Sequence, residues 1–260
     1  MNASFDIAAT NYDKTFTNTV IGKLQRSLVY QHLTEILSEN QATTILEVNC
    51  GTGEDAIWLA RQNYKVTATD ISSAMIAVAK NKINLENLIF READINNLPF
   101  PFLDQKFDMI FSNFGGLNCL SKTELRQFFK NSSELLTEKG QLALVIMPKN
   151  TLWEQFYFLT KANFKAVFRR KKENITANVD GENVKTYYHN PKEVVHLASE
   201  VFVINHLKPI GIFVPPSYLE PFFRKKPKLV SVLNSLENTV KNQSFLSKYA
   251  DHYLIALQKK

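Results

Sequence analysis

Residues 45–56, ILEVNCGTGEDA, decide the fold of this chain. The first four form a short apolar and β-branched run of the length of one buried strand. Asn49, Gly51 and Gly53 follow, and because they tolerate positive φ or leave room above the backbone they predict a tight turn. After Gly53 the apolar residues recur at the spacing of one buried helical face. A strand, a glycine turn and a helix in this order are typical of a nucleotide-cofactor site, since they present backbone N–H groups at a helix N-terminus.

The composition is ordinary for a globular protein. With 260 residues, of which 45% are hydrophobic and 22% charged, the chain has ample length for a core. No apolar run approaches the roughly 18 residues of a membrane span, and the N-terminus has no basic region before an apolar stretch, so we expect neither a span nor a secretory signal. Cys50 and Cys119 are no disulfide framework, and a reducing cytoplasm is the expected location.

The charge is unevenly distributed. The formal net charge is +6, and much of the excess lies in the runs 169–172 (RRKK) and 224–228 (RKKPK). Such runs are commonly solvated surface, but they would also attract nucleic acid, an anionic membrane surface or an acidic carrier protein. There is no zinc-type Cys/His spacing, no phosphate-loop signature and no repeat, and we expect no metal site.

Strands alternate with helices over the first part of the chain. Strand-like runs at 65–70, 88–91, 107–111 and 141–147 are separated by helical patterns, one of which we expect to continue to Gly140. This alternation predicts right-handed crossovers and a parallel sheet covered on both faces. After residue 148 the pattern changes. Aromatic residues at helical spacing predict one helix over 153–168, either packed in the core or forming a lid, and residues 180–183 (DGEN) predict a hairpin turn.

Two nucleotide cofactors remain open at this point. Gly51, Gly53 and Ala56 also fit the dinucleotide fingerprint, and Asp70 lies about 20 residues further on, where a ribose-binding acid is expected. This pattern alone would suit an NAD(P)-dependent oxidoreductase.

The surrounding residues favour the other cofactor. Glu47 followed by CGTG closely resembles the first motif of the class I S-adenosylmethionine-dependent methyltransferases, whose loop cradles the methionine part of the cofactor. Asp70, in VTATDIS, resembles the acid that binds both ribose hydroxyls, and an ionised carboxylate has two oxygens for this. Asp94, in READINNLPF, resembles the acid that meets the adenine amino group. The similarity spans residues 41–148 with the motifs in order.

This resemblance implies an α/β fold with three Rossmann-like layers. Its seven-stranded sheet has the order 3-2-1-4-5-7-6, and the last strand is antiparallel. We divide the chain into a helical segment over the cofactor (1–40), a cofactor-binding core (41–148), an acceptor-side cap (149–200) and C-terminal strands with a helical insertion (201–260). The implied cofactor-binding residues are Tyr12, Glu47, Asn49, Cys50, Gly51, Gly53, Asp70, Ile71, Asp94, Ile95 and Asn113.

Three details of the cofactor region stand out. The family usually has glycine at the position of Asn49, although asparagine tolerates the same left-handed geometry. Tyr12 and Asp13 resemble a Tyr-Asp pair found near the start of many small-molecule methyltransferases, where the segment folds over the cofactor. Arg26 could meet the cofactor carboxylate, but we expect a surface arginine there.

The exit of the fourth strand, residues 112–118 (SNFGGLN), bears on the methyl acceptor. It lacks the prolines of the motif found in methyltransferases of DNA base amines, so we expect no DNA substrate. Gly115 and Gly116 indicate backbone that passes close to a ligand or another element. We expect a small apolar or aromatic acceptor, and the neighbouring basic run would suit an acid group, a phosphate or an acidic carrier on it.

No catalytic residue stands out in the sequence. The reaction does not require one, because alignment of the acceptor with an activated methyl group can suffice. His189 and His252 are the candidates for a general base, although a structural role is commoner for such histidines. Besides the oxidoreductase, two alternatives remain: an RNA (tRNA) methyltransferase, suggested by the basic runs, and a cofactor-binding partner subunit without activity. The sequence does not indicate the oligomeric state.

Overall fold

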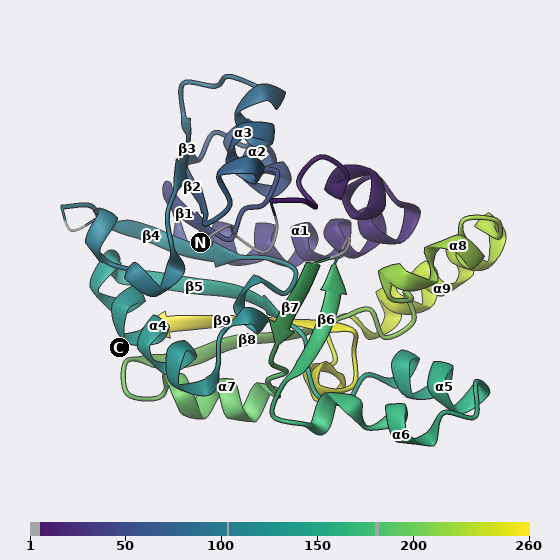
Figure 1. The fold of residues 1–260 in the computed structure, drawn as a ribbon. Helices are drawn as coiled ribbons and strands as arrows, with labels where there is room; N and C mark the ends of the chain where they lie inside the picture. The colour runs from purple at the N-terminus through teal and green to yellow at the C-terminus, as the bar shows by residue number, and fades with distance from the viewer. Residues whose placement is uncertain (1–5, 103, 180–181) are drawn as a thin grey trace.

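A seven-stranded sheet runs through the molecule between two layers of helices (Figure 1). The computed structural model describes residues 6–102, 104–179 and 182–260. The strands of this sheet, in chain order, are β1 (Thr44–Val48), β2 (Lys65–Asp70), β3 (Leu88–Glu92), β4 (Phe107–Ser112), β5 (Leu136–Ile146), β8 (Phe202–Ile210) and β9 (His252–Lys259). The spatial order is β3-β2-β1-β4-β5-β9-β8. The first five pair in parallel, whereas β9 is antiparallel to both of its neighbours. Counted within the sheet, this confirms the predicted order and the antiparallel last strand.

The central strands are apolar on both faces because helices cover both. Ile45 and Val66 pack with Leu33 of α1 on one face, where α2 and α3 also lie. Leu46 and Ile110, on the opposite face, join the cluster formed by α4 and α7. These helices are α1 (Val20–Asn40), α2 (Glu54–Arg61), α3 (Ser73–Lys82), α4 (Lys122–Leu135) and α7 (Pro191–Ala198). None of the described helices is long and apolar enough to cross a membrane.

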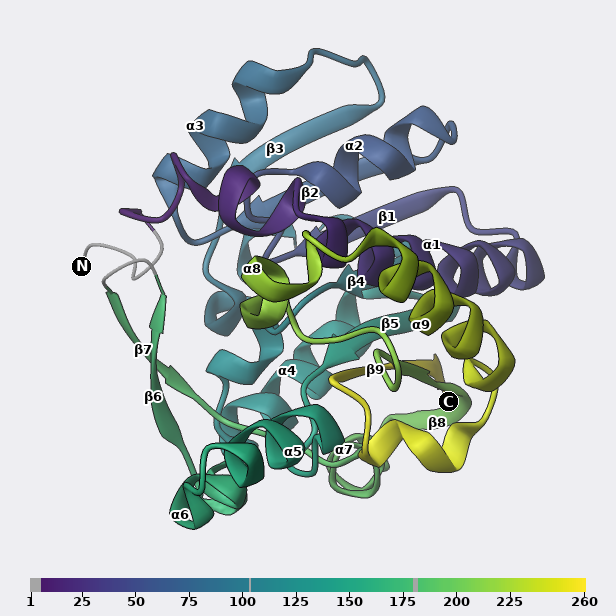
Figure 2. The same ribbon diagram turned by 90° about the vertical axis from the view of Figure 1, so that its right-hand side faces the viewer.

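The other elements form a cap beside the sheet (Figure 2). They are α5 (Leu152–Thr160), α6 (Phe164–Val167), α8 (Glu220–Phe223), α9 (Pro227–Val240) and the antiparallel hairpin of β6 (Ile175–Val179) and β7 (Glu182–Thr186). Short turns of helix complete the chain: η1 (Asp13–Thr17), η2 (Ile95–Asn97), η3 (Phe100–Phe102), η4 (Gly116–Cys119), η5 (Arg169–Lys171), η6 (Ser217–Leu219) and η7 (Ser244–Lys248).

Two predicted boundaries are wrong. The helix expected over 153–168 is two helices, because the backbone turns at Ala162 with φ of 52° and the Asn163 side chain caps a new start. The helix expected to continue to Gly140 ends at Leu135, since Leu136 already pairs with β4. The predicted hairpin turn includes residues 180 and 181, which lie outside the described part of the chain.

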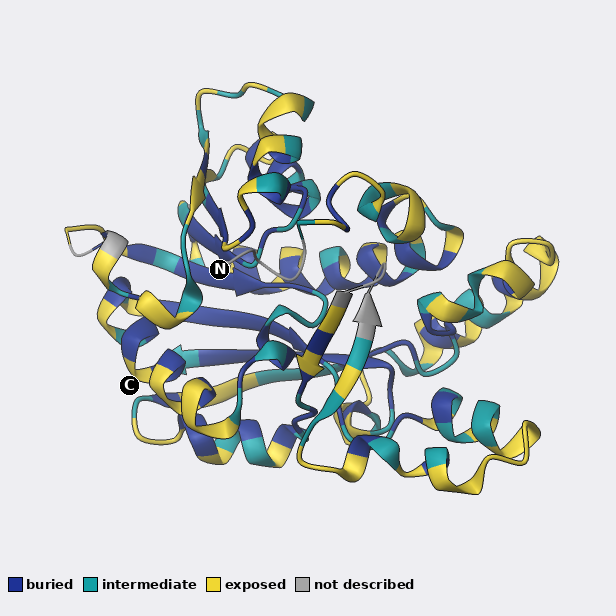
Figure 3. Cartoon of the chain, viewed as in Figure 1, coloured by how far each residue is buried: buried dark blue, intermediate teal, exposed yellow. Residues whose placement is uncertain are grey.

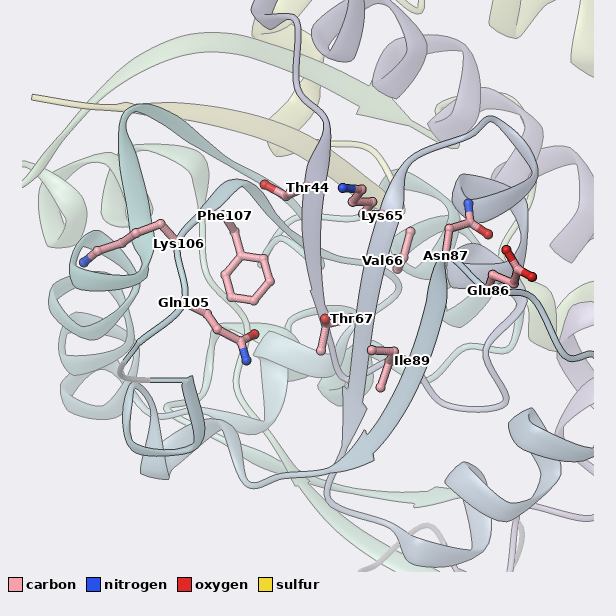
Figure 4. A pocket seen from close by; sticks show the side chains of 10 residues that line it. All are labelled: Thr44, Lys65, Val66, Thr67, Glu86, Asn87, Ile89, Gln105, Lys106 and Phe107. Atoms are coloured by element: carbon pink, nitrogen blue, oxygen red, sulfur yellow. The ribbon is translucent and has the colours of Figure 1, made fainter.

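A hollow of about 440 Å³ opens at the amino ends of the strands (Figure 4). It is lined by Thr44, Lys65 and Phe107 among others, and Ile89 on its wall is 48% exposed. Among the described residues between β3 and β4, only η2 and η3 are helical, so no long helix of the described chain covers this part of the sheet. Open α/β sheets bind their ligands at the carboxyl ends of the strands, so the functional site is expected at that edge of the sheet and not in this hollow.

Candidate active site

A cavity of about 460 Å³ lies at the carboxyl ends of β1 to β5. Its wall includes nine of the eleven predicted cofactor-binding residues: Tyr12, Asn49, Cys50, Gly51, Asp70, Ile71, Asp94, Ile95 and Asn113. The other two, Glu47 and Gly53, adjoin this wall in the chain without lining it. The cap closes the opposite side, and the volume is that of an ordinary small-molecule site. The fold thus brings the predicted residues together, while their roles toward a cofactor stay predictions.

The loop after β1 has the left-handed geometry that its residues favour. Asn49, Gly51 and Gly53 have φ of 58°, 53° and 78°. A Cβ on Gly53 would lie 2.6 Å from a ring carbon of Phe90, so this glycine lets the start of α2 pack on the sheet. A Cβ on Gly51 would meet only the Tyr12 ring, at 3.9 Å. Gly51 therefore leaves room for a ligand against bare backbone.

Asn49, the departure from the family pattern, packs against Gly116. A Cβ built on Gly116 would lie 2.5 Å from Cβ and 2.6 Å from Nδ2 of Asn49. The sequence predicted that the backbone at Gly115 and Gly116 passes close to a ligand or another element, and at Gly116 that element is the glycine loop. Because Gly116 has no side chain, there is room for the side chain of Asn49.

Asp70 joins the exit of β2 to the glycine loop. Its Oδ2 accepts a hydrogen bond from the Gly51 N–H at 2.8 Å, and its Oδ1 accepts one from the Ser72 N–H at 2.9 Å. Burial raises the pKa of Asp70, and these two hydrogen bonds oppose that rise. The carboxylate thereby sets the shape of the loop and still lies on the cavity wall.

Asp13 holds the N-terminal segment over the same loop. Its carboxylate accepts from Thr52 Oγ1 at 2.6 Å and lies 2.6 Å from Lys82 Nζ. This contact brings Tyr12 to the cavity wall, where burial raises the pKa of its phenol to about 12. Tyr12 is therefore a neutral hydrogen-bonding group at physiological pH.

Arg26 is buried, which corrects the expected surface position. It is 7% exposed, and its Nε donates to Asp55 Oδ1 at 2.9 Å. Tyr30 donates to the same oxygen at 2.8 Å, and Asn113 Nδ2 donates to Asp55 Oδ2 at 3.1 Å. Sequence reasoning missed Asp55, whose only signal was its place in the first helical turn after the glycine loop. The network anchors three chain segments around the cavity.

Three buried polar atoms near the loop have no hydrogen-bond partner among the described residues: Arg26 Nη1, Glu47 Oε2 and Asn49 Nδ2. Burial raises the pKa of Glu47 well above its usual range, and the nearby charge of Asp55 adds to this. Unpartnered buried polar groups are costly and call for a ligand or water. A cation, an amide and a carboxyl complement the carboxylate and ammonium groups of an amino acid, so the residues present fit the methionine part of S-adenosylmethionine.

Asp94 is both a cap and a wall residue. Its carboxylate accepts from the Asn96 N–H at 2.8 Å and so caps η2. The same residue lines the cavity beside Ile95. Capping thus fixes the position of the side chain that the resemblance assigns to the adenine.

Neither histidine proposed as a general base belongs to the cavity wall as the structure describes it. His189 is buried with Nε2 3.0 Å from the Leu120 carbonyl oxygen, and burial lowers its pKa. His252 stacks edge-on against Phe114, and its Nδ1 lies 3.2 Å from Asp251 Oδ2. Neither side chain lines the described cavity, although His252 packs directly behind Phe114, which does.

On the cap side of the cavity, two arginines share one buried acid. Arg169 and Arg170 line the wall with Tyr188 and Tyr218. Glu154, 2% exposed, accepts from Arg169 Nε and Nη2 at 2.7 and 3.0 Å and from Arg170 Nε at 2.8 Å. Arg170 lies 4.6 Å above the Tyr188 ring. Part of the basic run is therefore a structured element of the site, which sequence reasoning could not see because nothing marked Glu154 as its partner.

Comparison with known proteins identifies the cofactor. Residues 45–140 match a family model described as methyltransferase domain, and this range contains the glycine loop, Asp70 and Asp94. Residues 45–140 therefore form a methyltransferase domain of the class I S-adenosylmethionine-dependent type. Its cofactor is S-adenosylmethionine, which decides between the two nucleotides left open by the glycine pattern.

The similar proteins differ in what their names say they methylate. This methyltransferase is 31% identical over 198 residues to a malonyl-[acyl-carrier protein] O-methyltransferase of Bacillus cereus, covering 74% of this chain and 65% of that protein. It is 29% identical over 142 residues to a demethylmenaquinone methyltransferase of Tropheryma whipplei, covering 54% and 56%. The chain thus spans less than two thirds of each relative.

A solved structure supports the same fold. The CcbJ methyltransferase of Streptomyces caelestis aligns over 99% of this chain and 98% of its own, with a TM-score of 0.65 and 14% sequence identity. At this identity the alignment is evidence for the fold alone.

Proposed function

We propose that this chain transfers a methyl group from S-adenosylmethionine to a small acceptor that carries a carboxylate. The observation that carries this proposal is the pair Arg169 and Arg170 on the acceptor side of the cavity, oriented by the buried Glu154. Arginine recognises carboxylates through a planar fork of donors. Both arginines share Glu154, and Asp251 Oδ1 lies 3.6 Å from Arg170 Nη2. Arg169, with 38% of its side chain exposed, is therefore the better placed of the two to meet an acceptor carboxylate.

The residues of the chain would hold, align and shield the reactants. When bound, the cofactor supplies a methyl group on a positively charged sulfur that leaves as a neutral thioether. The glycine loop and Asp70 would hold the cofactor, while Arg169 would place one carboxylate oxygen so that the other faces the methyl carbon. At neutral pH a carboxylate has no proton to remove. This agrees with the position of His189 and His252 outside the described wall, and it favours O-methylation.

The finer proposal is that the acid is bound to a carrier. The Bacillus cereus relative is named for a malonyl group on an acyl carrier protein, and such a malonyl group has one free carboxylate. The demethylmenaquinone relative supports instead an apolar aromatic acceptor. The arginine pair favours the acid, because a guanidinium group at the wall can bind a further carboxylate and gains nothing comparable from an uncharged quinone ring.

The test measures methyl transfer from radiolabelled S-adenosylmethionine to three acceptors: a malonyl thioester on an acyl carrier protein, the methyl ester of that thioester, and a quinol. We expect transfer to the free acid only. Arg169→Met should lower transfer by about 10- to 100-fold, the loss of one charged hydrogen-bonding pair, and leave S-adenosylhomocysteine affinity unchanged by calorimetry. Lys165→Met, an exposed change on the same cap, is the control. Transfer to the ester or the quinol, or no effect of Arg169→Met, would reject the acid acceptor.

A further inference from the structure

The cap exposes aromatic rings that a packed helix would bury. Phe156, Phe164 and Phe168 are 63%, 69% and 54% exposed, and Phe222 of α8 is 54% exposed. The packed-core interpretation of the aromatic set from 153 to 168 is therefore wrong for these three phenylalanines. Single exposed hydrophobic residues are ordinary, but several large rings on adjoining elements indicate a surface that binds something.

The same elements account for the net positive charge of the chain. Residues 152–172 and 217–236 contain 10 of its 31 Lys and Arg residues but only 2 of its 25 Asp and Glu residues. The other 219 residues contain 21 basic and 23 acidic ones. Eight of the ten cations are exposed: Lys161, Lys165, Lys171, Lys172, Arg224, Lys225, Lys226 and Lys228. The positive net charge is thus a property of the cap.

The two acids of these segments are already engaged. Glu154 is buried between Arg169 and Arg170. Glu220 accepts from the backbone N–H groups of Val20 and Ile21 at 3.1 and 3.0 Å, and so caps the N-terminus of α1. Within the described residues of 152–172 and 217–236, the exposed cations are therefore not neutralised by acids of their own segments.

The elements that carry these rings and cations lie on one side of the molecule (Figure 2). Tyr157 of α5 meets Tyr218 at 5.6 Å between ring centroids, and Trp153 meets Phe223 at 5.7 Å, which joins α5 to α8. Figure 2 shows α5, α6 and α8 on the side facing the viewer, and Figure 3 shows how much of them is exposed. We call this surface, formed by the four exposed phenylalanines and eight exposed cations above, the cap face.

On the cap face two lysine side chains lie over exposed rings. Lys171 Nζ is 4.6 Å from the centroid of Phe168, and Lys226 Nζ is 4.2 Å from that of Phe222. Phenylalanine beside lysine, with the ring apolar and the ammonium able to reach outward, is the composition of segments that lie in the headgroup region of a bilayer. Clusters of four to eight cations are typical of binding to anionic lipids.

We propose that the cap face binds the surface of an anionic lipid bilayer. The charge alone would equally suit an acidic carrier protein or RNA, but four exposed phenyl rings favour the apolar boundary that lies beneath lipid headgroups. Tyr218 and Arg169 line the cavity and are also partly exposed. Tyr218 is 44% exposed, and the side chain of Arg169 is 38% exposed. The side of the cavity that Arg169 and Tyr218 line therefore adjoins the cap face.

Cosedimentation of the full chain with vesicles tests this proposal without any turnover. We expect binding to vesicles containing phosphatidylglycerol, little binding to pure phosphatidylcholine, and a steep fall with salt. The double variant Lys225→Glu/Lys226→Glu and the double variant Phe164→Ser/Phe222→Ser should each lower the partition coefficient at least about tenfold. Lys80→Glu/Lys139→Glu changes the net charge equally on exposed residues elsewhere and should retain binding.

All variants should bind S-adenosylhomocysteine as the wild type does, which shows that they fold. Absence of vesicle binding, equal loss in the control variant, or unchanged binding after both cap-face substitutions would overturn the proposal. Binding of an acyl carrier protein or tRNA at the cap face without vesicle binding would also overturn it. These results are independent of the acceptor, so methyl transfer to a carboxylate can fail while lipid binding is retained, and the reverse.

Discussion

The packing of Asn49 on Gly116 predicts a steric coupling between two loops. In Gly116→Ala the new methyl group would lie 2.5 Å from Asn49 Cβ and 2.6 Å from Nδ2, where ordinary contacts are 3.4–4 Å. One of the loops must move by about 1 Å, and overpacking of this size costs about 2 kcal/mol. Gly116 does not have positive φ, so the alanine backbone itself is unstrained. We expect the melting temperature to fall by about 4–8 °C.

Asn49→Gly should restore this loss, because it removes the atoms that the new methyl group would meet. The single variant Asn49→Gly keeps the positive φ that glycine adopts freely and should change stability by less than about 1 kcal/mol. The double variant should therefore be close to wild type in urea denaturation, with a coupling energy of about 2 kcal/mol.

Gly115→Ala serves as the control for this cycle. Its φ of 82° strains any side chain, and its Cβ would meet Met147 rather than Asn49. Asn49→Gly should not rescue it. If Gly116→Ala costs the same with and without Asn49, the steric reasoning fails. S-adenosylhomocysteine binding should also be measured by calorimetry for the wild type, Gly116→Ala, Asn49→Gly and their double variant. We expect weaker binding for Gly116→Ala alone.

Three further perturbations follow from buried groups. Asp70→Asn leaves one of two backbone N–H groups without an acceptor, and calorimetry should show at least about tenfold weaker S-adenosylhomocysteine binding; unchanged affinity would contradict the assigned role. Glu237 accepts from the four consecutive N–H groups of residues 211–214. Glu237→Gln should cost about 3 kcal/mol in urea denaturation, against no measurable change for the exposed Glu138→Gln. Burial lowers the pKa of His32 in the folded protein from 6.5 to about 4. Between these two pH values the histidine is protonated in the unfolded chain but neutral in the folded one. Stability from this group is complete above pH 6.5 and lost on acidification towards pH 4, by about 3 kcal/mol; a similar pH dependence in His32→Leu would refute its origin.

Continuous stretches of sequence were sufficient to predict which residues meet at the carboxyl edge of the sheet. The glycine loop, Asp70 and Asp94 each lie at a strand exit within a local pattern of strand, turn and helix. Parallel strands bring their carboxyl ends to one edge, so residues at those exits meet without further information. The sheet order followed in the same way, from the family motifs arranged along residues 41–148.

Tertiary structure decided what depends on contacts between distant segments. Arg26 reads as an ordinary helical surface residue, yet it is buried because Asp55 and Asn113, from two other segments, arrive beside it. Arg169 and Arg170 line the cavity because Glu154, buried between them, fixes both guanidinium groups. Whether a charge is buried or exposed depends on the partner that folding brings to it, and no periodicity in the sequence records that partner. The local sequence predicted the cofactor loop. Only the tertiary structure determined which charged side chains line the cavity and which are exposed on the cap.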